Sequence, residues 1–272
     1  MLIAQDGEVN EAERISEENI QAQVAHSLVS VDHDDWTVIT ECLAALSALE
    51  KNQDKLENHV VDHAISDAYE PKNYEDAVTC ADASRWIPSM EEEIKEIIAN
   101  QVWDVVDPPP GVSILTGKFA YKVKTNADGE VTRYKSRWCA RGFEQELGVD
   151  VLETFASVVK PMSYKLLFVL ACLLGWSIEQ MDVKTAFLYG KIDTDVYMEL
   201  PPNIKDQYPG KICKLNKALY GLKQSPRIWY LTLSQALRPM GFVAISEDQS
   251  VFVNRDKRLV IATYVDDLLI LG

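Results

Sequence analysis

Two adjacent aspartates near the end of the chain are the first residues whose type and spacing indicate chemistry. Asp266 and Asp267 lie inside the apolar run Leu259–Leu271, where an ordinary strand connection would carry Asn-Gly, Asp-Gly or another glycine-containing pair. Removing one ionised carboxylate from water without a partner costs on the order of several kcal/mol. Two such groups on a tight hairpin suit divalent metal ions, which take oxygen ligands. The alternative is an exposed Asp-Asp turn that joins two buried strands.

A third carboxylate ends a predicted strand about eighty residues earlier. Residues 176–181 alternate between apolar and polar types, and Asp182 follows them directly. A carboxylate at the end of a buried strand has a rigid support, which a binding or catalytic site requires. We therefore group Asp182 with the Asp-Asp pair.

A strongly basic β-hairpin precedes these carboxylates in the chain. Phe119, Tyr121 and Val123 alternate with polar residues up to a turn at residues 128–129, and a second extended stretch covers Val131–Ala140. The cations on or beside it are Lys118, Lys122, Lys124, Arg133, Lys135, Arg137 and Arg141. Such a surface suits phosphate groups, whose neutralisation dominates nucleic-acid affinity. The alternative is a solvated sheet edge whose charges prevent aggregation.

A weaker metal pattern lies in the N-terminal part of the chain. His59 and His63 are one helical turn apart, a spacing that resembles the inverted zinc-protease motif. Asp62 stands where that motif has glutamate, and the sequence offers no third ligand. A solvated helix face is the better interpretation.

Helix and strand signals describe the elements that would hold these groups. Apolar residues at three- and four-residue spacing predict a helix over residues 86–100, followed by a strand at Trp103–Val106. Ser163 is suitably placed to cap a second helix that continues to Leu174, and Gly175 is suited to end it.

The last third of the chain carries one more helix and several strands. Ser225 and Pro226 form an N-cap and first-turn pair. The apolar face of that helix comprises Trp229, Leu233, Leu237 and Met240, with Gly241 after it. Strands are predicted at residues 196–200, 251–253 and 259–265.

Charge separates the N-terminal segment from the rest. Residues 1–80 carry 18 acidic and 4 basic residues, whereas residues 81–272 carry 24 and 23. The net charge of -15 therefore does not argue against nucleic-acid binding, which follows local basic patches. Five scattered cysteines without a Cys-x-x-Cys pair indicate a reducing, intracellular setting. No membrane role is implied, because the longest apolar run, near residues 166–176, is too short to cross a bilayer.

Five segments occur in an order that is specific as an ensemble. They are Trp86 with MEEE at 90–93, YKSRWCARGFEQ at 134–145, QMDVKTAFLYG at 180–190, ALYGLKQSPRIW at 218–229 and YVDDLLILG at 264–272. With them, residues 73–272 closely resemble the reverse transcriptases of copia-type LTR retrotransposons. The resemblance implies an RNA-directed DNA polymerase that transfers a nucleotide from a dNTP to the 3′-hydroxyl of an RNA or DNA template-primer.

The resemblance also implies roles for individual residues. Asp182, Asp266 and Asp267 match the family's three metal-binding aspartates, and Val183 belongs to the same site. They are expected to hold two Mg²⁺ ions, for which Mn²⁺ can substitute. Phe187 matches the aromatic residue that excludes a 2′-hydroxyl, so the expected product is DNA. The alternative for Phe187 is a place in the core.

Further residues are matched to the nucleotide and the base pair. Thr185 and Ala186 fall where backbone amides approach the triphosphate, and Gly221 belongs to the segment that shapes the base-pair pocket. The candidates for contacts to the β- and γ-phosphates are Lys124, Lys135 and Arg137, and the choice among them is open. Tyr220 stands where many retroviral enzymes have glutamine, which leaves the hydrogen bonds of that position open.

The expected fold is α+β, the fingers and palm of a right-hand polymerase over residues 73–272, with an acidic, partly helical extension over residues 1–72. Family members continue into a thumb and an RNase H domain, so we expect a truncated piece of a polyprotein from which both are absent. On this interpretation Leu268–Leu271 is an exposed hydrophobic edge, and the chain alone extends no primed RNA detectably. The implied location is intracellular, in cytoplasmic virus-like particles and in the nucleus. The alternative is an inactive relic that at most binds nucleic acid or a protein partner.

Overall fold

A computed structural model describes residues 69–126, 128–146 and 148–272 of the chain. The predicted His59–His63 pair and nearly all of the N-terminal extension lie outside the described residues. No helix in the described ranges is both long and apolar enough to cross a membrane.

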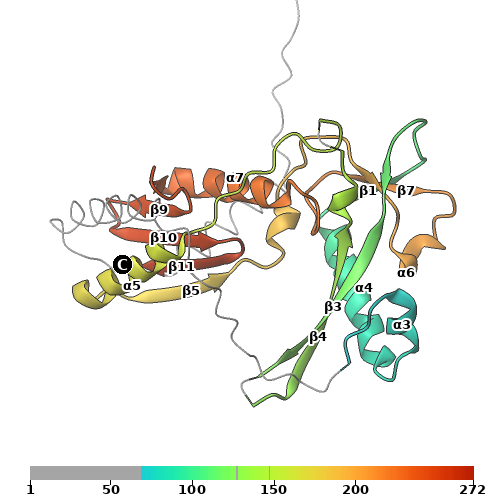
Figure 1. The fold of residues 1–272 in the computed structure, drawn as a ribbon, viewed down its shortest axis with the longest axis horizontal. Coiled ribbons are helices and arrows are strands. Elements are labelled where there is room, and N and C mark those ends of the chain that lie inside the picture. The colour runs from blue at the N-terminus through green and yellow to red at the C-terminus, as the bar shows by residue number, and fades with distance from the viewer. Residues whose placement is uncertain (1–68, 127, 147) are drawn as a thin grey trace, which may run out of the picture. The chain divides into compact units, whose positions relative to one another are not determined.

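The described chain divides into two compact units, whose larger elements are labelled in Figure 1. The sheet unit comprises Ala156–Tyr189 and Trp229–Gly272. The hairpin unit comprises residues 69–155 and Gly190–Ile228. Both units combine helices with mainly antiparallel strands, which agrees with a mixed α and β fold.

The sheet unit is built on one antiparallel five-stranded sheet with the order β5-β11-β10-β9-β8. Its strands are β5 Ile178–Asp182, β8 Val243–Ala244, β9 Val251–Asn254, β10 Leu259–Tyr264 and β11 Asp267–Leu271. Its helices are α5 Pro161–Leu174, η2 Ala186–Tyr189, η3 Arg238–Met240 and the greater part of α7 Ser225–Leu237. Side chains alternate along a strand, so Leu268 and Ile270 pack with α7, whereas Leu269 and Leu271 pack with α5.

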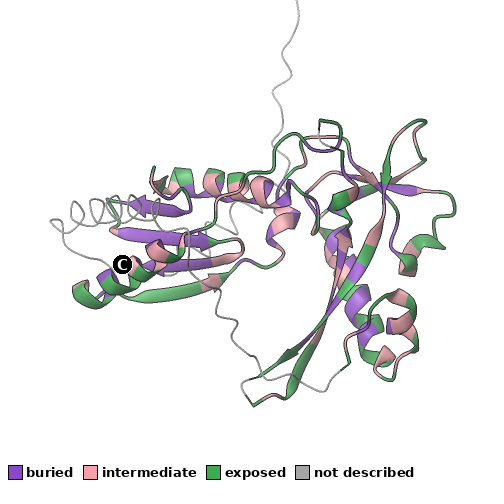
Figure 2. Ribbon diagram, viewed as in Figure 1, coloured by how far each residue is buried: buried purple, intermediate pink, exposed green. Residues whose placement is uncertain are grey.

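The last strand is not an exposed edge, and the prediction for Leu268–Leu271 was wrong. β11 lies between β5 and β10 and pairs with both, and these four side chains are at most 8 % exposed. Figure 2 shows β10 and β11 as mostly buried and β5 as mostly exposed. An apolar run does not reveal which strands will flank it, so the sequence could not tell an inner strand from an edge.

Helix α5 begins earlier than predicted, and a distant residue holds its N-terminus. It starts at Pro161, which has no N–H to leave unpaired in the first turn. The Ser163 hydroxyl donates to Oδ2 of the buried Asp248 (2.7 Å), and the Lys160 N–H donates to the same oxygen (2.9 Å). Ser163 is therefore not the N-cap. The helix ends as predicted, at Gly175 in the left-handed conformation (φ 68°).

Helix α7 begins at Ser225, but this residue does not cap it. The Ser225 hydroxyl donates to the carbonyl oxygen of Leu219 at 2.5 Å instead of accepting a helix N–H. The predicted apolar face is confirmed for Trp229, Leu233 and Leu237, which are all buried. Met240 lies beyond the end of α7, in η3, and is only partly buried.

The hairpin unit contains a two-stranded hairpin and a four-stranded sheet with the order β1-β7-β6-β2, in which β2 and β6 are parallel. Its strands are β1 Trp103–Val106, β2 Ile114–Leu115, β3 Gly117–Thr125, β4 Val131–Ala140, β6 Tyr197–Met198 and β7 Ile212–Leu215. Its helices are α3 Tyr74–Thr79, α4 Ala83–Ala99, η1 Gly142–Glu144 and α6 Pro202–Lys205. The helix, the β1 strand and the hairpin predicted from the sequence are confirmed, whereas the strand predicted at 196–200 is reduced to β6.

Candidate active site

The Asp-Asp hairpin is a two-residue turn with a strained backbone. Tyr264 pairs with Asp267 across β10 and β11, so Val265 and Asp266 form the turn. Val265 has φ 57°, and Asp266 is not among the positive-φ residues of the described chain. A positive φ at the first turn position alone is the pattern of a type II′ hairpin, which favours glycine there. A β-branched residue in this conformation stores roughly 1–3 kcal/mol of strain.

Two hydrogen bonds from neighbouring elements hold this turn in place. The indole Nε1 of the buried Trp229 on α7 donates to the carbonyl oxygen of Val265 at 2.7 Å. The Val183 N–H, just after β5, donates to the carbonyl oxygen of Asp266 at 2.9 Å. Strain persists only where the surroundings enforce it, so this turn is a rigid mount for the side chains of Asp266 and Asp267.

The strand register brings the third predicted carboxylate to the same place. Asp182 lies directly opposite Asp267 across β5 and β11, and such cross-strand pairs have Cα atoms about 4.5–5.5 Å apart and share one face. Gln180 Nε2 donates a long hydrogen bond to Asp267 Oδ1 (3.4 Å). The Val183 side chain is buried and has no ligand atom, so only its backbone carbonyl could serve as a metal ligand.

The three aspartates supply the oxygen ligands that a hard cation takes, but their side chains are not gathered in the geometry of a bound metal ion. Across residues 69–126, 128–146 and 148–272, no group of three or more His, Cys, Asp or Glu side chains has the geometry to hold a metal ion. Neighbouring carboxylates repel one another without a cation between them, which favours separated rotamers. Carboxylate oxygens on rigid strands are the ligands that Mg²⁺ prefers.

The residues matched to the nucleotide follow directly after β5. Thr185 has φ 56°, and its carbonyl oxygen accepts the Leu188 N–H at 2.8 Å. Ala186 is buried, and the partly buried Phe187 packs against the core cluster beneath α7. This packing agrees with a core role for Phe187, and the sugar-gate role stays a prediction.

The register of the basic hairpin places its cations on one face. Lys122 pairs with Lys135 and Lys124 with Arg133, and directly opposite residues point to the same side. By the same alternation, six cations share this basic face, namely Lys118, Lys122, Lys124, Arg133, Lys135 and Arg137. The opposite face carries the buried side chains Phe119, Tyr121, Val123 and Trp138.

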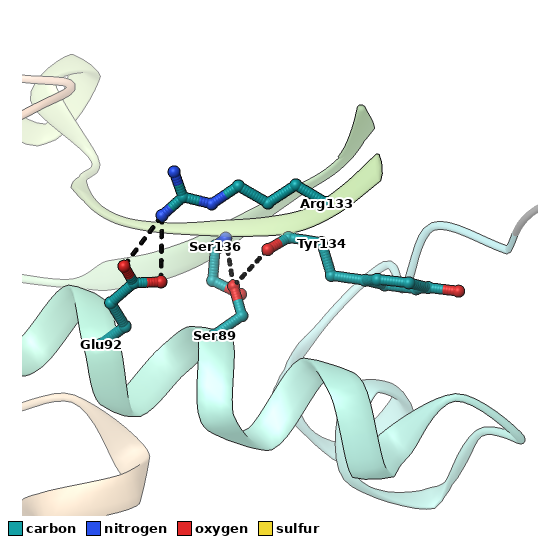
Figure 3. A network of polar contacts seen from close by, with 5 residues as sticks. All are labelled: Ser89, Glu92, Arg133, Tyr134 and Ser136. Carbon is teal, nitrogen blue, oxygen red and sulfur yellow. Dashed lines mark hydrogen bonds and ion pairs between the residues drawn. The ribbon is translucent and has the colours of Figure 1, made fainter. Parts of the chain in front are cut away.

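Two cations of the basic face form exposed ion pairs. Lys122 Nζ lies 3.0 Å from Glu70, and the Arg133 guanidinium lies 2.9 Å from Glu92 on α4 (Figure 3). Exposed pairs contribute only about 0–1 kcal/mol and are screened by salt. A polyanion could therefore displace Glu92 at little cost, whereas Glu70 is also held by the Val123 N–H, which it accepts at 2.9 Å.

Helix α4 closes the outer edge of strand β4. The Ser89 hydroxyl donates to the Tyr134 carbonyl oxygen at 3.0 Å and accepts the Ser136 N–H at 2.8 Å (Figure 3). One helical turn later, Glu93 Oε1 accepts the Trp138 N–H at 3.2 Å. The backbone that carries the basic residues of β4 is thus bonded to β3 on one edge and to α4 on the other.

Glu93 is the titratable group most affected by this packing. Burial raises the pKa of Glu93 from its ordinary 4.5 to about 7, against the opposing influence of the Trp138 N–H, Arg137 and Lys135. Its carboxyl group therefore changes charge near neutral pH, beneath two of the candidate phosphate ligands.

Arg137 is the candidate phosphate ligand that the structure brings to the Gly221 segment. Its guanidinium lies over the Tyr220 ring, 4.6 Å from the centroid, in a cation–π contact. The Tyr220 carbonyl oxygen accepts the Ala140 N–H at 2.8 Å. Lys124 and Lys135 lie farther along the hairpin toward its turn. Tyr220 therefore positions Arg137 through its ring.

Gly221 is required by two separate features of the backbone. It has φ 89°, and a Cβ atom on it would overlap the carbonyl oxygen of Ala140. A Cβ atom on Gly142 would in turn overlap the carbonyl oxygen of Gly221. The segment around Gly221 therefore lies in direct backbone contact with the end of β4.

A buried glutamine pair that the sequence reasoning missed holds the same segments together. Gln145 Nε2 donates to Gln224 Oε1 (2.9 Å), and Gln224 Nε2 donates to the Asp150 carbonyl oxygen (3.0 Å). The Lys223 N–H donates to Gln145 Oε1 (2.8 Å). Both glutamines lie within the motifs matched in the sequence. Their pairing could have been suspected there only from the general rule that buried amide groups need hydrogen-bond partners.

Comparison with known proteins identifies the family to which the chain is similar. Residues 100–272 match the family described as reverse transcriptase (RNA-dependent DNA polymerase). The chain is 44% identical over 200 residues to the retrovirus-related Pol polyprotein from transposon RE1 of Arabidopsis thaliana, covering 72% of this chain and 14% of that protein. It is 36% identical over 214 residues to the corresponding polyprotein from transposon TNT 1-94 of Nicotiana tabacum, covering 76% and 16%.

The chain thus spans about one seventh of the length of these curated relatives, which are copia-type retrotransposon polyproteins. The family match covers more than half of the chain and includes all three aspartates, the Gly221 segment and the basic hairpin. The chain belongs to the reverse transcriptase (RNA-dependent DNA polymerase) family, in its copia-type branch.

Proposed function

We propose that this chain carries the nucleotidyl-transfer centre of an RNA-directed DNA polymerase. The observation that carries the proposal is the direct opposition of Asp182 and Asp267 across β5 and β11, with Asp266 beside them on a strained, doubly bonded turn. An ordinary hairpin turn requires neither the strain nor the second aspartate. In this proposal the sheet unit is the palm and the hairpin unit the fingers.

The three aspartates would hold two Mg²⁺ ions through their carboxylate oxygens, with the Val183 carbonyl as a further ligand. Bound there, the ions would lower the pKa of the primer 3′-hydroxyl and neutralise the triphosphate and the leaving pyrophosphate. Asp182, on β5, and Asp267, on β11, fix the distance between their carboxylates through the strand pairing. The Trp229 indole keeps the turn from relaxing, which preserves the direction of Asp266.

The basic residues would bind and orient the polyanionic substrates. Arg137, placed by the Tyr220 ring, is the strongest candidate for a triphosphate contact, followed by Lys135 and Lys124 in order of distance from the Gly221 segment. In the sheet unit, the Thr185 and Ala186 amides would approach a triphosphate, and Phe187 would exclude a 2′-hydroxyl.

The natural partners in this proposal are a dNTP and an RNA or DNA template-primer. Template phosphates would occupy the basic face, where the exposed Glu92 can be displaced. Binding should therefore weaken steeply as the salt concentration rises.

The proposal is tested by extension of a labelled DNA primer on an RNA template with Mg²⁺ and dNTPs. The assay uses the chain alone and the chain fused after Gly272 to the downstream segment of a relative. Asp267→Asn should abolish any extension, because it removes a ligand charge at nearly constant shape. Asp256→Asn, in the exposed turn between β9 and β10, is the matched control and should leave extension unchanged. Extension that survives Asp267→Asn would contradict the metal-site assignment.

The second candidate is a domain that binds nucleic acid without catalysis, and the observation that favours it is the row of cations on the basic face of the hairpin. The same samples separate the two functions. Oligonucleotide binding with no extension in either form, at any Mg²⁺ or Mn²⁺ concentration, would favour the binding domain.

A further inference from the structure

The apolar ring of Phe143 is exposed to solvent, although the turn that carries it is rigid. It lies in the short helix η1, directly after β4, and its side chain is 77 % exposed. A single exposed apolar residue is ordinary on a protein surface. Phe143 differs because every neighbouring residue of its turn is fixed, so its exposure does not result from a loose loop.

The fixed neighbours can be followed one residue at a time. Gly142 is in backbone contact with Gly221. The Glu144 carboxylate accepts both the N–H and the hydroxyl of Thr116, each at 2.7 Å, and these two bonds lower the pKa of Glu144. Gln145 is buried and bonded to Gln224. Among residues 142–145, only the Phe143 side chain points out of the packed structure.

The charges around the ring fit a nucleic-acid strand. Arg141 is exposed, and Lys223 places its ammonium 3.0 Å from the Gln145 carbonyl oxygen. Two acids are also close in sequence, Glu144, which is occupied by Thr116, and the exposed Glu146. The net charge around Phe143 is therefore near zero, and electrostatic attraction alone would not bring a nucleic-acid strand to this residue.

The basic face explains why a nucleic-acid strand would lie near Phe143, because β4 leads directly from that face into η1. A strand whose phosphates lie along the hairpin cations has its bases within reach of a ring mounted at the end of β4. A flat aromatic ring held open to solvent beside a phosphate-binding surface is the usual stacking platform for single-stranded nucleic acid.

We propose that Phe143 stacks on an unpaired base of the template strand. The inference rests on the proposed polymerase function and adds a residue that contacts the template base. It specifies a contact to the flat face of a base, which is insensitive to sequence, in contrast to the phosphate contacts of the hairpin.

The experiment measures binding of fluorescein-labelled oligo-dT, and of an abasic oligonucleotide of equal length, by fluorescence anisotropy. Phe143→Ala should weaken oligo-dT binding at least about fivefold, which is the lower end of the contribution of stacking on one base. It should leave the abasic oligonucleotide unaffected, because that probe has phosphates but no bases. Phe143→Trp should restore oligo-dT binding. Phe155→Ala is the matched control, since Phe155 is 72 % exposed in the same unit, and it should change neither affinity.

Salt dependence provides the second readout. The slope of log affinity against log salt should be the same for the wild type and Phe143→Ala, because no phosphate contact is lost, whereas Arg137→Gln should reduce it by about 1. Equal losses on the two probes, or no loss on oligo-dT, would overturn the stacking role while leaving the proposed polymerase function intact. A wild-type chain that binds neither probe at low salt would overturn both.

Discussion

Replacing Gly221 with alanine should destabilise the hairpin unit more than any other glycine substitution between residues 129 and 221. Two costs combine there. Gly221 has φ 89°, and the new Cβ would overlap the carbonyl oxygen of Ala140. Relief of that overlap requires the backbone to move, which stretches the hydrogen bond from the Ala140 N–H to the Tyr220 carbonyl oxygen.

The size of each cost can be set from general magnitudes. A left-handed conformation costs a residue with a Cβ atom about 1–2 kcal/mol. Forced overpacking adds about 1–3 kcal/mol. The total of about 2–5 kcal/mol is a large share of the roughly 5–15 kcal/mol that stabilises a typical domain.

Two other glycines separate the contributions. Gly129 has φ 84°, and a Cβ atom added to it would meet nothing within 4 Å, so Gly129→Ala reports the conformational cost alone. Gly142 has no positive φ, but its Cβ would overlap the Gly221 carbonyl oxygen, so Gly142→Ala reports the steric cost alone. Free energies of unfolding come from urea titrations followed by tryptophan fluorescence. Hydrogen exchange at the Ala140 amide reports the local opening.

The expected order is Gly221→Ala as the most destabilised, with a loss close to the sum of the other two. The double variant of Gly142 and Gly221 should lose less than the sum of its single variants, since one movement of the backbone relieves both overlaps. If Gly221→Ala lowers the free energy of unfolding no more than Gly129→Ala does, the segment around Gly221 is not packed against β4 as described. Gly221 would then have no steric reason to be glycine.

Four other outcomes are expected. Titration of Mg²⁺ or Mn²⁺ should raise the unfolding temperature of the wild type and much less that of Asp266→Asn; equal shifts would contradict the metal assignment. The raised pKa of Glu93 means that the folded state holds its proton more tightly, so the free energy of unfolding should fall by up to about 3 kcal/mol as the pH rises from 4.5 to about 7. Glu93→Gln, which can still accept the Trp138 N–H, should remove that fall. If the free energy of unfolding of Glu93→Gln depends on pH as it does in the wild type, the raised pKa of Glu93 is contradicted. Asp248→Ala should cost about 3 kcal/mol by leaving the Ser163 hydroxyl and two backbone N–H groups unpaired, measured against the near-neutral Asp256→Asn. In the extended chain, Phe187→Val should raise ribonucleotide incorporation relative to deoxyribonucleotide; an unchanged ratio would return Phe187 to the core.

Local patterns predicted most elements, because they depend on the residues within each element. The spacing of Trp86, Met90 and Ile94 suffices for α4, and the alternation at Phe119 and Tyr121 suffices for β3. Gly175 ends α5 as predicted, since glycine adopts the left-handed conformation without steric cost, whatever its distant neighbours are.

Features that depend on distant partners could not be predicted in the same way. Ser163 looked like a cap because the sequence gives no sign that Asp248, 85 residues away, reaches the same helix end. The burial of Leu268–Leu271 depends on β5 pairing along one side of β11. At the site, the motifs singled out Arg137 and Gly221 separately, but only the folded chain shows that Tyr220 links them.

The hydrogen bonds of Asp248 to Lys160 and Ser163, at the start of α5, also bear on how the chain is made. At about 5–20 residues per second, the 85 residues between Ser163 and Asp248 correspond to roughly 4–17 s of translation. During that interval the start of α5 lacks these two bonds, and β5 waits at least as long for β11, the strand with which it pairs. The sheet unit therefore cannot complete its nucleus until the Asp-Asp turn has been synthesised. Both parts of the acidic site should then become ordered in one late cooperative step, and until that step the nascent chain is a substrate for chaperones.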